Sequence, residues 1–282
     1  MKFPLGIMAD SLRLPIWDAV IKSAELGANG VQIYAVGGEF CFENIPDTKR
    51  SQYKSLLGDL GISISALCGD FGGHGFQIPA DNPKRLRESR KVMDLAVSLD
   101  CKVVTTHIGA IPHDRNSERY AILHEAATKL GAIGESYGGV FAIETGPEEP
   151  ERLKQFLDDV GSKGMGVNYD PANLVMVTGS DPVKGVYTLK DYIVHTHAKD
   201  GLNLVPCDPD IIYGPDAPDI LETIAKVEYF REVPLGEGAV DLPGWLKALE
   251  DIGYEGFVTI ERELGEDPIA DIQKAVSFLK TL

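Results

Sequence analysis

The chain has 282 residues, of which 44% are hydrophobic and 25% are charged. This composition is that of a folded globular protein with a large core, and it excludes a disordered chain. The formal net charge of −16 repels nucleic-acid phosphates, and no apolar run is long enough to cross a bilayer. We therefore expect a cytoplasmic protein whose partners include neither a nucleic acid nor a membrane.

Short apolar or β-branched runs alternate with longer amphipathic runs along the whole chain, which is typical of βα units around a parallel sheet. Eight runs are predicted to be strands, at residues 4–9, 30–35, 63–70, 102–109, 139–146, 165–173, 192–200 and 256–263. Eight strands that are each followed by a helix predict a closed (β/α)8 TIM barrel. An open doubly wound sheet is disfavoured because no glycine-rich phosphate turn follows the first strand.

The helices expected between these strands carry recognisable ends. The helical run at 16–27 keeps its apolar residues on one face and stops at Gly27, which suits a left-handed cap. The runs at 83–100 and 268–282 begin with proline, a residue that the first helical turn accepts. These signals support the alternation of strands and helices.

One segment departs from the regular alternation. No low-complexity linker divides the chain, so residues 1–282 are predicted to form a single TIM-barrel domain. Between the predicted seventh and eighth strands, however, residues 201–240 are rich in proline and glycine. Long structured loops in compact domains are usually functional, so we interpret this segment as an insertion over the active-site mouth.

Four side chains of ligand type stand near the ends of strands five to eight, and they are Glu144, Asp170, His197 and Glu261. The carboxyl ends of barrel strands converge on one mouth, so these side chains can surround a single ion. Three carboxylates and one imidazole form an oxygen-rich set that suits a divalent ion, Mn²⁺ first, with Mg²⁺ or Co²⁺ as alternatives. The sequence therefore predicts a metal-dependent enzyme.

The motifs around these residues are IETG at Glu144, DPAN at Asp170, HTHAKDG at 195–201, PLGEGAVD at 234–241 and GYEGFVTIE ending at Glu261. Together they resemble the xylose-isomerase-like TIM-barrel family of sugar (phosphate) isomerases and epimerases, over essentially the whole chain. That family also contains inosose dehydratases and, more distantly, metal-dependent apurinic endonucleases. The resemblance implies a metal held by the four ligands, with the two glutamates on opposite sides of a bound sugar.

The resemblance also implies a reaction in which Glu144 and Glu261 transfer a proton through a metal-stabilised enediolate. Reprotonation on the opposite face of the same carbon gives an epimerase, and protonation of the neighbouring carbon gives an isomerase. The alternative is a lyase or dehydratase that expels a β-hydroxyl from a keto-sugar or inosose. A nuclease is disfavoured by the acidic composition and the six histidines.

Six further polar side chains are candidate contacts for a small carbohydrate substrate, and they are Asn173, His107, His195, Lys199, His74 and Arg231. Many ketose 3-epimerases of the family have a histidine at the position of Asn173, and an asparagine can bind a sugar oxygen but cannot shuttle a proton. His195 shares one side of its strand with His197, so it is a substrate contact, a support for the ligands or a hydrogen-bonded barrel residue.

The charge of the substrate and the oligomeric state are less constrained. The acidity of the chain and the lack of a clustered basic patch favour an uncharged substrate over a phosphorylated one. No sequence pattern indicates whether the protein is a monomer or a homo-oligomer.

Overall fold

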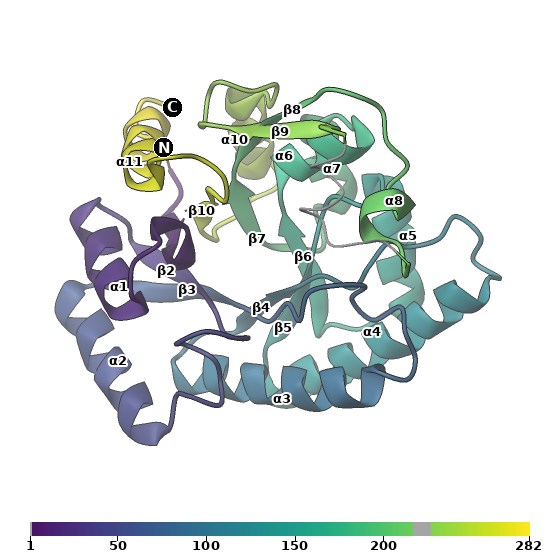
Figure 1. Cartoon of the computed structure of the whole chain (residues 1–282), viewed down its shortest axis with the longest axis horizontal. Coiled ribbons are helices and arrows are strands. Elements are labelled where there is room, and N and C mark those ends of the chain that lie inside the picture. The colour runs from purple at the N-terminus through teal and green to yellow at the C-terminus, as the bar shows by residue number, and fades with distance from the viewer. Residues whose placement is uncertain (1, 217–226) are drawn as a thin grey trace.

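The computed structural model describes residues 2–216 and 227–282, and its centre is a closed barrel of eight parallel strands (Figure 1). The predicted TIM barrel is thereby confirmed. Around the barrel the order is β1-β10-β7-β6-β5-β4-β3-β2, and β1 pairs with β10 to close it. The barrel strands are β1 (Leu5–Met8), β2 (Gly30–Tyr34), β3 (Ser63–Cys68), β4 (Val103–Thr106), β5 (Val140–Glu144), β6 (Met165–Tyr169), β7 (Ile193–Ala198) and β10 (Val258–Ile260).

A helix of at least eight residues follows each barrel strand and packs on the outside (Figure 1). These helices are α1 (Ile16–Glu25), α2 (Asp47–Leu60), α3 (Asn82–Ser98), α4 (Glu118–Tyr137), α5 (Pro150–Val160), α7 (Pro182–Leu189), α10 (Leu242–Asp251) and α11 (Pro268–Leu279). Three short helical pieces lie just after strands, and they are η1 (Ala9–Leu12), α6 (Pro171–Asn173) and η2 (Leu174–Thr178). Within the described ranges, no helix has both the length and the apolar composition needed to span a bilayer.

The eight predicted strands are confirmed in place, but several of them are shorter than predicted. The predicted strand at 165–173 ends at Tyr169, because Asp170 turns the chain by capping α6. The predicted stop at Gly27 is confirmed, since this glycine has φ +91° just after α1.

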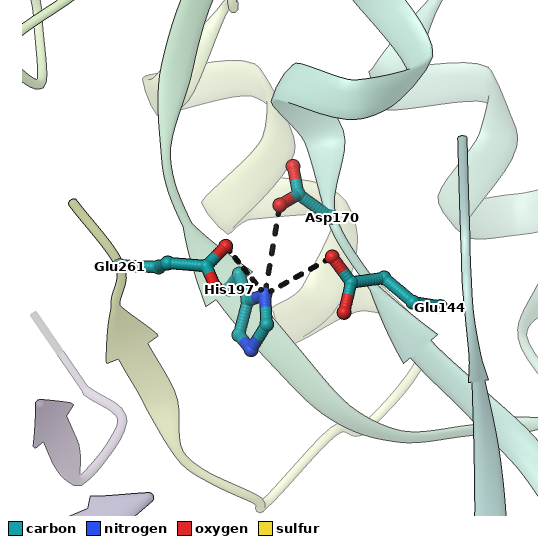
Figure 2. Close-up of side chains that lie close together, drawn as sticks. All are labelled: Glu144, Asp170, His197 and Glu261. Carbon is teal, nitrogen blue, oxygen red and sulfur yellow. Dashed lines mark ion pairs between the residues drawn. The ribbon is translucent and has the colours of Figure 1, made fainter. Parts of the chain in front are cut away.

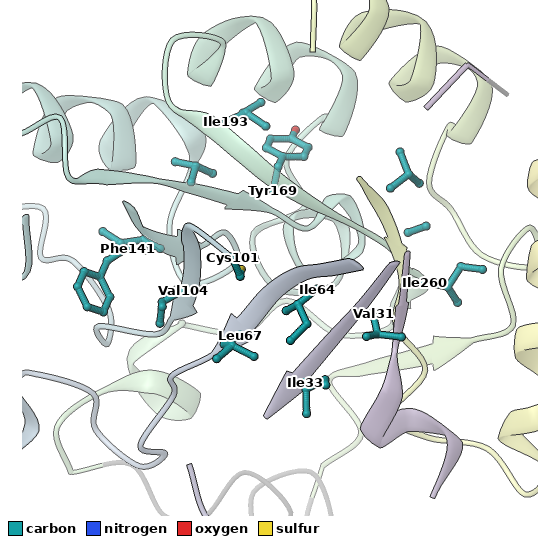
Figure 3. Packing of buried hydrophobic residues seen from close by; sticks show 14 of the residues in the cluster. Val31, Ile33, Ile64, Leu67, Cys101, Val104, Phe141, Tyr169, Ile193 and Ile260 are labelled. Carbon is teal, nitrogen blue, oxygen red and sulfur yellow. The ribbon is translucent and has the colours of Figure 1, made fainter. Parts of the chain in front are cut away.

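The two faces of the barrel strands carry different side chains. On β2, Val31 and Ile33 belong to the apolar core (Figure 3). Successive side chains of a strand point to opposite faces, so Gln32 faces the barrel interior, where it reaches Thr105 and His197. The interior below the mouth is therefore polar, and the apolar core lies between strands and helices.

The described part of the segment predicted as an insertion, 201–240, contains a two-stranded ribbon and a short helix, and residues 217–226 lie outside the described part of the chain. β8 (Asp200–Asn203) and β9 (Phe230–Val233) form an antiparallel ribbon outside the barrel. Between them lies α8 (Asp210–Tyr213), whose last carbonyl accepts a 2.7 Å hydrogen bond from Gln77 Nε2. Asp210 also forms a salt bridge with Arg119 of α4.

Candidate metal centre

The four predicted ligand residues come together at the carboxyl end of the barrel (Figure 2). All four are buried, and one potential ligand atom from each lies within 4.8 Å of the others. His197 is at the centre, with Nδ1 3.2 Å from Glu261 Oε2, 3.5 Å from Asp170 Oδ2 and 3.6 Å from Glu144 Oε1. Four adjacent strands thus bring one imidazole and three carboxylates to one point.

The two carboxylate oxygens of Asp170 have different roles, because one caps α6 and the other faces the ligand cluster. Its Oδ1 accepts the backbone N–H groups of Ala172 and Asn173, which fixes the start of α6. The Thr145 hydroxyl donates to the Asp170 carbonyl and accepts from its N–H, at 2.9 and 2.8 Å. The other oxygen, Oδ2, has no hydrogen-bond partner among the described residues and faces His197. The DPAN motif therefore presents a free carboxylate oxygen.

Gln32 sets the orientation of the His197 ring. His197 Nε2 lies 2.9 Å from Gln32 Oε1, while the Gln32 amide nitrogen donates to Thr105 Oγ1 at 3.1 Å. This contact is shorter than the 3.3 Å from Nε2 to Asn168 Nδ2, so it favours a proton on Nε2, and the ring then directs Nδ1 toward the carboxylates. Burial favours the neutral ring, but Glu261 and Glu144 outweigh it and raise the pKa of His197 in the metal-free protein.

The donor atoms of the cluster fit a divalent ion. Two buried atoms without hydrogen-bond partners in the described chain, His197 Nδ1 and Asp170 Oδ2, face each other across 3.5 Å. Buried polar atoms normally have partners, so such a pair marks a place for a bound group. Oxygen-rich surroundings and one imidazole are the donors that divalent ions of the Mn²⁺ or Mg²⁺ type accept. A metal is therefore compatible with the cluster.

Glu144 is held by amide groups. Its Oε1 accepts from Asn173 Nδ2 at 2.9 Å, and its Oε2 accepts from Asn168 Nδ2 at 3.0 Å. His107 Nε2 lies 3.7 Å from the same Oε2. Burial raises the pKa of Glu144, but the positive charges of His107 and His197 outweigh burial and hold it below its usual value.

His107 lies between two carboxylates. Its Nδ1 is 3.2 Å from Asp70 Oδ2, and its Nε2 faces Glu144. Burial lowers the pKa of an imidazole, but Glu144 and Asp70 more than compensate and raise the pKa of His107 to about 10. At neutral pH His107 therefore carries a positive charge in the metal-free site.

Glu261 is held by an ammonium group instead. Lys199 Nζ donates to Glu261 Oε2 at 3.0 Å and to Glu263 Oε2 at 2.5 Å. Lys199 is 4% exposed, and Glu261 and Glu263 raise its pKa despite the opposing effect of burial. Burial likewise raises the pKa of Glu261, but the charges of His197 and Lys199 hold it well below its usual value.

A cavity of about 360 Å³ opens above the cluster, a size typical of small-molecule sites. Its wall includes five of the residues predicted for the site, and they are Glu144, Glu261, Asn173, His107 and Lys199. The end of α8 forms another part of the wall through Ile212, Tyr213 and Gly214. Two of the predicted metal ligands and three of the predicted substrate contacts thus share one cavity.

His195 is not among the residues that line this cavity. Its Nδ1 is 2.8 Å from Asn168 Oδ1, and its Nε2 is 3.1 Å from Thr259 Oγ1, inside the barrel. It shares a strand face with His197 as expected, but it comes two residues earlier and therefore lies deeper. Of the roles predicted for His195, this position favours that of a hydrogen-bonded barrel residue.

His74 and Arg231 are also not among the residues that line the cavity, so their role as substrate contacts stays a prediction. His74 Nε2 is 3.0 Å from Asp81 Oδ2, although Gly72 of the same loop does line the cavity. Arg231 lies on β9, where its exposed guanidinium pairs with Glu228. Each side chain has a partner on its own surface segment.

Sequence reasoning missed three residues that organise the site. Gln32 and Asn168 are polar residues inside apolar strands, GVQIY and MGVNY, and this interruption was the signal available. The third is Asp200, whose carboxylate accepts four backbone N–H groups. These belong to Gly201, Gly236, Gly238 and Val240. Asp200 therefore shapes the PLGEGAVD loop, where a Cβ on Gly238 would lie 2.0 Å from its Oδ1.

Comparison with known proteins confirms the resemblance. Residues 20–282 match the family model described as xylose isomerase-like TIM barrel. An uncharacterised protein of Methanocaldococcus jannaschii is 26% identical over 220 residues, which cover 72% of this chain. The chain spans 65% of the length of that curated relative.

Solved structures share the fold over nearly the whole chain. A xylose isomerase domain protein from Planctomyces limnophilus has a TM-score of 0.79 and 23% identity, covering 99% of this chain and 96% of its own. A probable 3-DHS dehydratase from Bacillus anthracis has a TM-score of 0.74 and 17% identity, covering 99% of both chains. A D-allulose 3-epimerase from Methylomonas sp. has a TM-score of 0.74 and 18% identity, covering 99% and 97%. At these identities the likeness concerns the fold.

Proposed function

The chain belongs to the xylose isomerase-like TIM-barrel family, and from its site geometry we propose that it is a divalent-metal-dependent isomerase or epimerase of a sugar or sugar derivative. One observation carries this proposal. Glu144 and Glu261 both line the cavity, from the ends of β5 and β10, with β6 and β7 between them. Two carboxylates separated in this way can remove a proton on one side of a substrate and return it on the other.

Glu144, Asp170, His197 and Glu261 would hold the ion. When bound, a divalent ion supplies positive charge that offsets the negative charge developing on the substrate oxygens as a C–H proton is lost. The oxygen-rich donor set favours Mn²⁺, with Mg²⁺ or Co²⁺ as alternatives.

The protein side chains supply the remaining functions. Glu144 and Glu261 both have pKa values below their usual range in the metal-free protein, so each is available as a proton acceptor. Whichever carboxylate takes the proton acts as the base, and the other, protonated from solvent, acts as the acid that protonates the opposite face of the carbon. Asn173, His107 and Lys199 line the cavity and offer donors to sugar oxygens. We further propose that α8 of the insertion, through Tyr213, covers the bound sugar.

A specific observation supports the alternative of a lyase or dehydratase. His107 has a raised pKa of about 10 and lines the cavity, where its ring lies between Asp70 and Glu144. A cationic N–H at this place can donate a proton to a departing hydroxyl group. The product distinguishes the two reactions, because elimination leaves an unsaturated sugar.

The test is solvent exchange by the metal-loaded protein. Candidate keto-sugars are incubated in deuterated water, and deuterium in the re-formed sugar supports isomerisation, while an unsaturated product supports elimination. Glu144→Gln and Glu261→Gln should each lower the rate by roughly 10² to 10⁴-fold, because each removes one proton carrier. Exposed Glu266 provides the control variant, Glu266→Gln. Full activity of Glu144→Gln, or a protein that binds no divalent ion, would refute the proposal.

A further inference from the structure

The cavity above the ligand cluster has an acidic wall. Four of its lining residues carry carboxylates, and they are Asp70, Glu144, Glu261 and Glu263. Asp170, in the cluster itself, adds a fifth. Lys199 is the one lysine or arginine among the lining residues of the described chain. Even with a divalent ion bound and His107 counted as a cation, the negative charges remain in excess, so an anionic group would be repelled.

Lys199 is already used by the protein. Its side chain is 4% exposed, and its ammonium group donates to both Glu261 and Glu263. A phosphate or carboxylate on the substrate would compete with Glu261 and Glu263 for this ammonium. Drawing the ammonium away from Glu261, which is itself buried, would break a buried ion pair, an unfavourable change. The third N–H of Lys199 is sufficient for a hydroxyl oxygen.

Arginines that contact the segments bordering the cavity are engaged in the same way. Each one donates to a carbonyl or carboxylate of the protein. The pairs are Arg13 with the carbonyls of Glu263 and Gly265, Arg85 with the carbonyl of Gly72, Arg119 with the carboxylate of Asp210, and Arg262 with the carboxylates of Glu232 and Asp271. In the described part of the chain, the guanidinium groups at the cavity border therefore bind groups of the protein itself.

We propose that the site accepts an uncharged sugar and discriminates against sugar phosphates and sugar acids, an inference that rests on the proposed function. Carboxylates such as Asp70 and Glu263 accept hydrogen bonds from hydroxyl groups and repel anions. The ammonium of Lys199 serves to balance Glu261 and Glu263, so it recognises a hydroxyl and not an anionic group. The cavity wall thus selects substrates by charge.

Calorimetry of the metal-loaded protein tests this inference without requiring turnover. The protein is titrated with matched pairs of ketopentoses and ketohexoses and their terminal phosphate esters, such as D-fructose and D-fructose 6-phosphate. Within each pair that binds, the free ketose should bind at least about tenfold more tightly, because the ester brings like charges together. Tighter binding of any ester than of its free ketose, or no binding by any free ketose, would overturn the inference.

A second measurement separates this inference from the proposed function. The same pairs are assayed for deuterium exchange. Preferential binding of free ketoses without any exchange would support the charge preference and refute the proton-transfer reaction. Exchange that is faster with an ester than with its free ketose would uphold the reaction and overturn the charge preference.

Glu263→Gln tests the assigned role of Lys199. The substitution removes one carboxylate partner and leaves the ammonium partly free. We expect the preference for the free ketose to fall by roughly threefold to tenfold, because one repulsive charge is lost and one donor is released. Glu266→Gln, an exposed acid on the same loop, should keep the wild-type preference. An unchanged preference in Glu263→Gln would contradict the role given to this pair.

Discussion

The two sides of the metal centre hold the same chemical group by different means. On the β5–β6 side, Glu144 is fixed by the neutral amides of Asn168 and Asn173. On the β7–β10 side, Glu261 is fixed by the ammonium of Lys199. Amides fix the direction of a carboxylate, whereas a buried ammonium also favours its ionised state. We therefore expect the loss of the Glu261 partner to lower the free energy of unfolding more than the loss of one Glu144 partner.

The largest expected difference comes from Lys199→Met, which removes the cation and keeps the length of the side chain. Breaking a buried ion pair leaves an uncompensated charge, so the metal-free protein should lose about 3 kcal/mol of unfolding free energy. Urea unfolding in the presence of a chelator measures this change. Excess Mn²⁺ should reduce the loss, because a cation again lies beside Glu261. A loss that is the same with and without Mn²⁺ would contradict the role of charge.

Asn173→Ala is the matched change on the other side. It removes one of the two amide donors to Glu144, while Asn168 still donates to the second oxygen. A hydrogen bond to a charged group contributes about 1.5 to 3 kcal/mol, so we expect a loss near the lower end, about 1.5 kcal/mol. The same urea experiment applies. If Asn173→Ala destabilised the metal-free protein more than Lys199→Met, the comparison of the two sides would be wrong.

The sequence predicted the fold and the ligand set because both depend on local patterns. Strand ends are visible in the alternation of apolar runs, and barrel geometry brings their carboxyl ends together. The depth of a side chain in the barrel and its contacts across the barrel depend on residues far apart in the sequence, so local patterns do not predict them. His195 shares a strand face with His197 but lies about 6.6 Å deeper at the rise of a parallel strand. Gln32 and His197 are separated by 165 positions, and only the closed barrel joins them.

Gln32 acts on His197, which lies between the two sides. Gln32→Met removes the acceptor for His197 Nε2 and frees the ring to rotate or change tautomer. We expect the affinity for Mn²⁺ to fall by roughly tenfold to 100-fold, the range for lost supporting partners of metal-bound histidines. Titration calorimetry at fixed pH measures this affinity.

Two further variants test whether the lost hydrogen bond causes the lower affinity of Gln32→Met for Mn²⁺. Gln32→Glu keeps an acceptor oxygen, so it should recover part of the affinity. Thr105→Val removes only the group that orients the Gln32 amide, and its effect should be smaller than that of Gln32→Met. An unchanged affinity in Gln32→Met would show that the protein holds the ring of His197 without this hydrogen bond.

The smallest expected effect is a pH dependence on the Glu144 side. In the metal-free protein the pKa of His107 is raised from 6.5 to about 10, because Glu144 and Asp70 outweigh burial. A raised folded-state pKa means that the folded protein binds this proton more tightly than the unfolded chain does. The resulting stabilisation is fully present below about pH 6.5 and is lost as the pH rises through about 10.

His107→Gln should therefore destabilise the protein more at about pH 6 than at about pH 10 in urea unfolding with a chelator. His113→Gln, at an exposed position, is the control. An equal destabilisation at both pH values would mean that His107 contributes by packing alone. Glu144 would then be stabilised by the amides of Asn168 and Asn173 and not by the charge of His107.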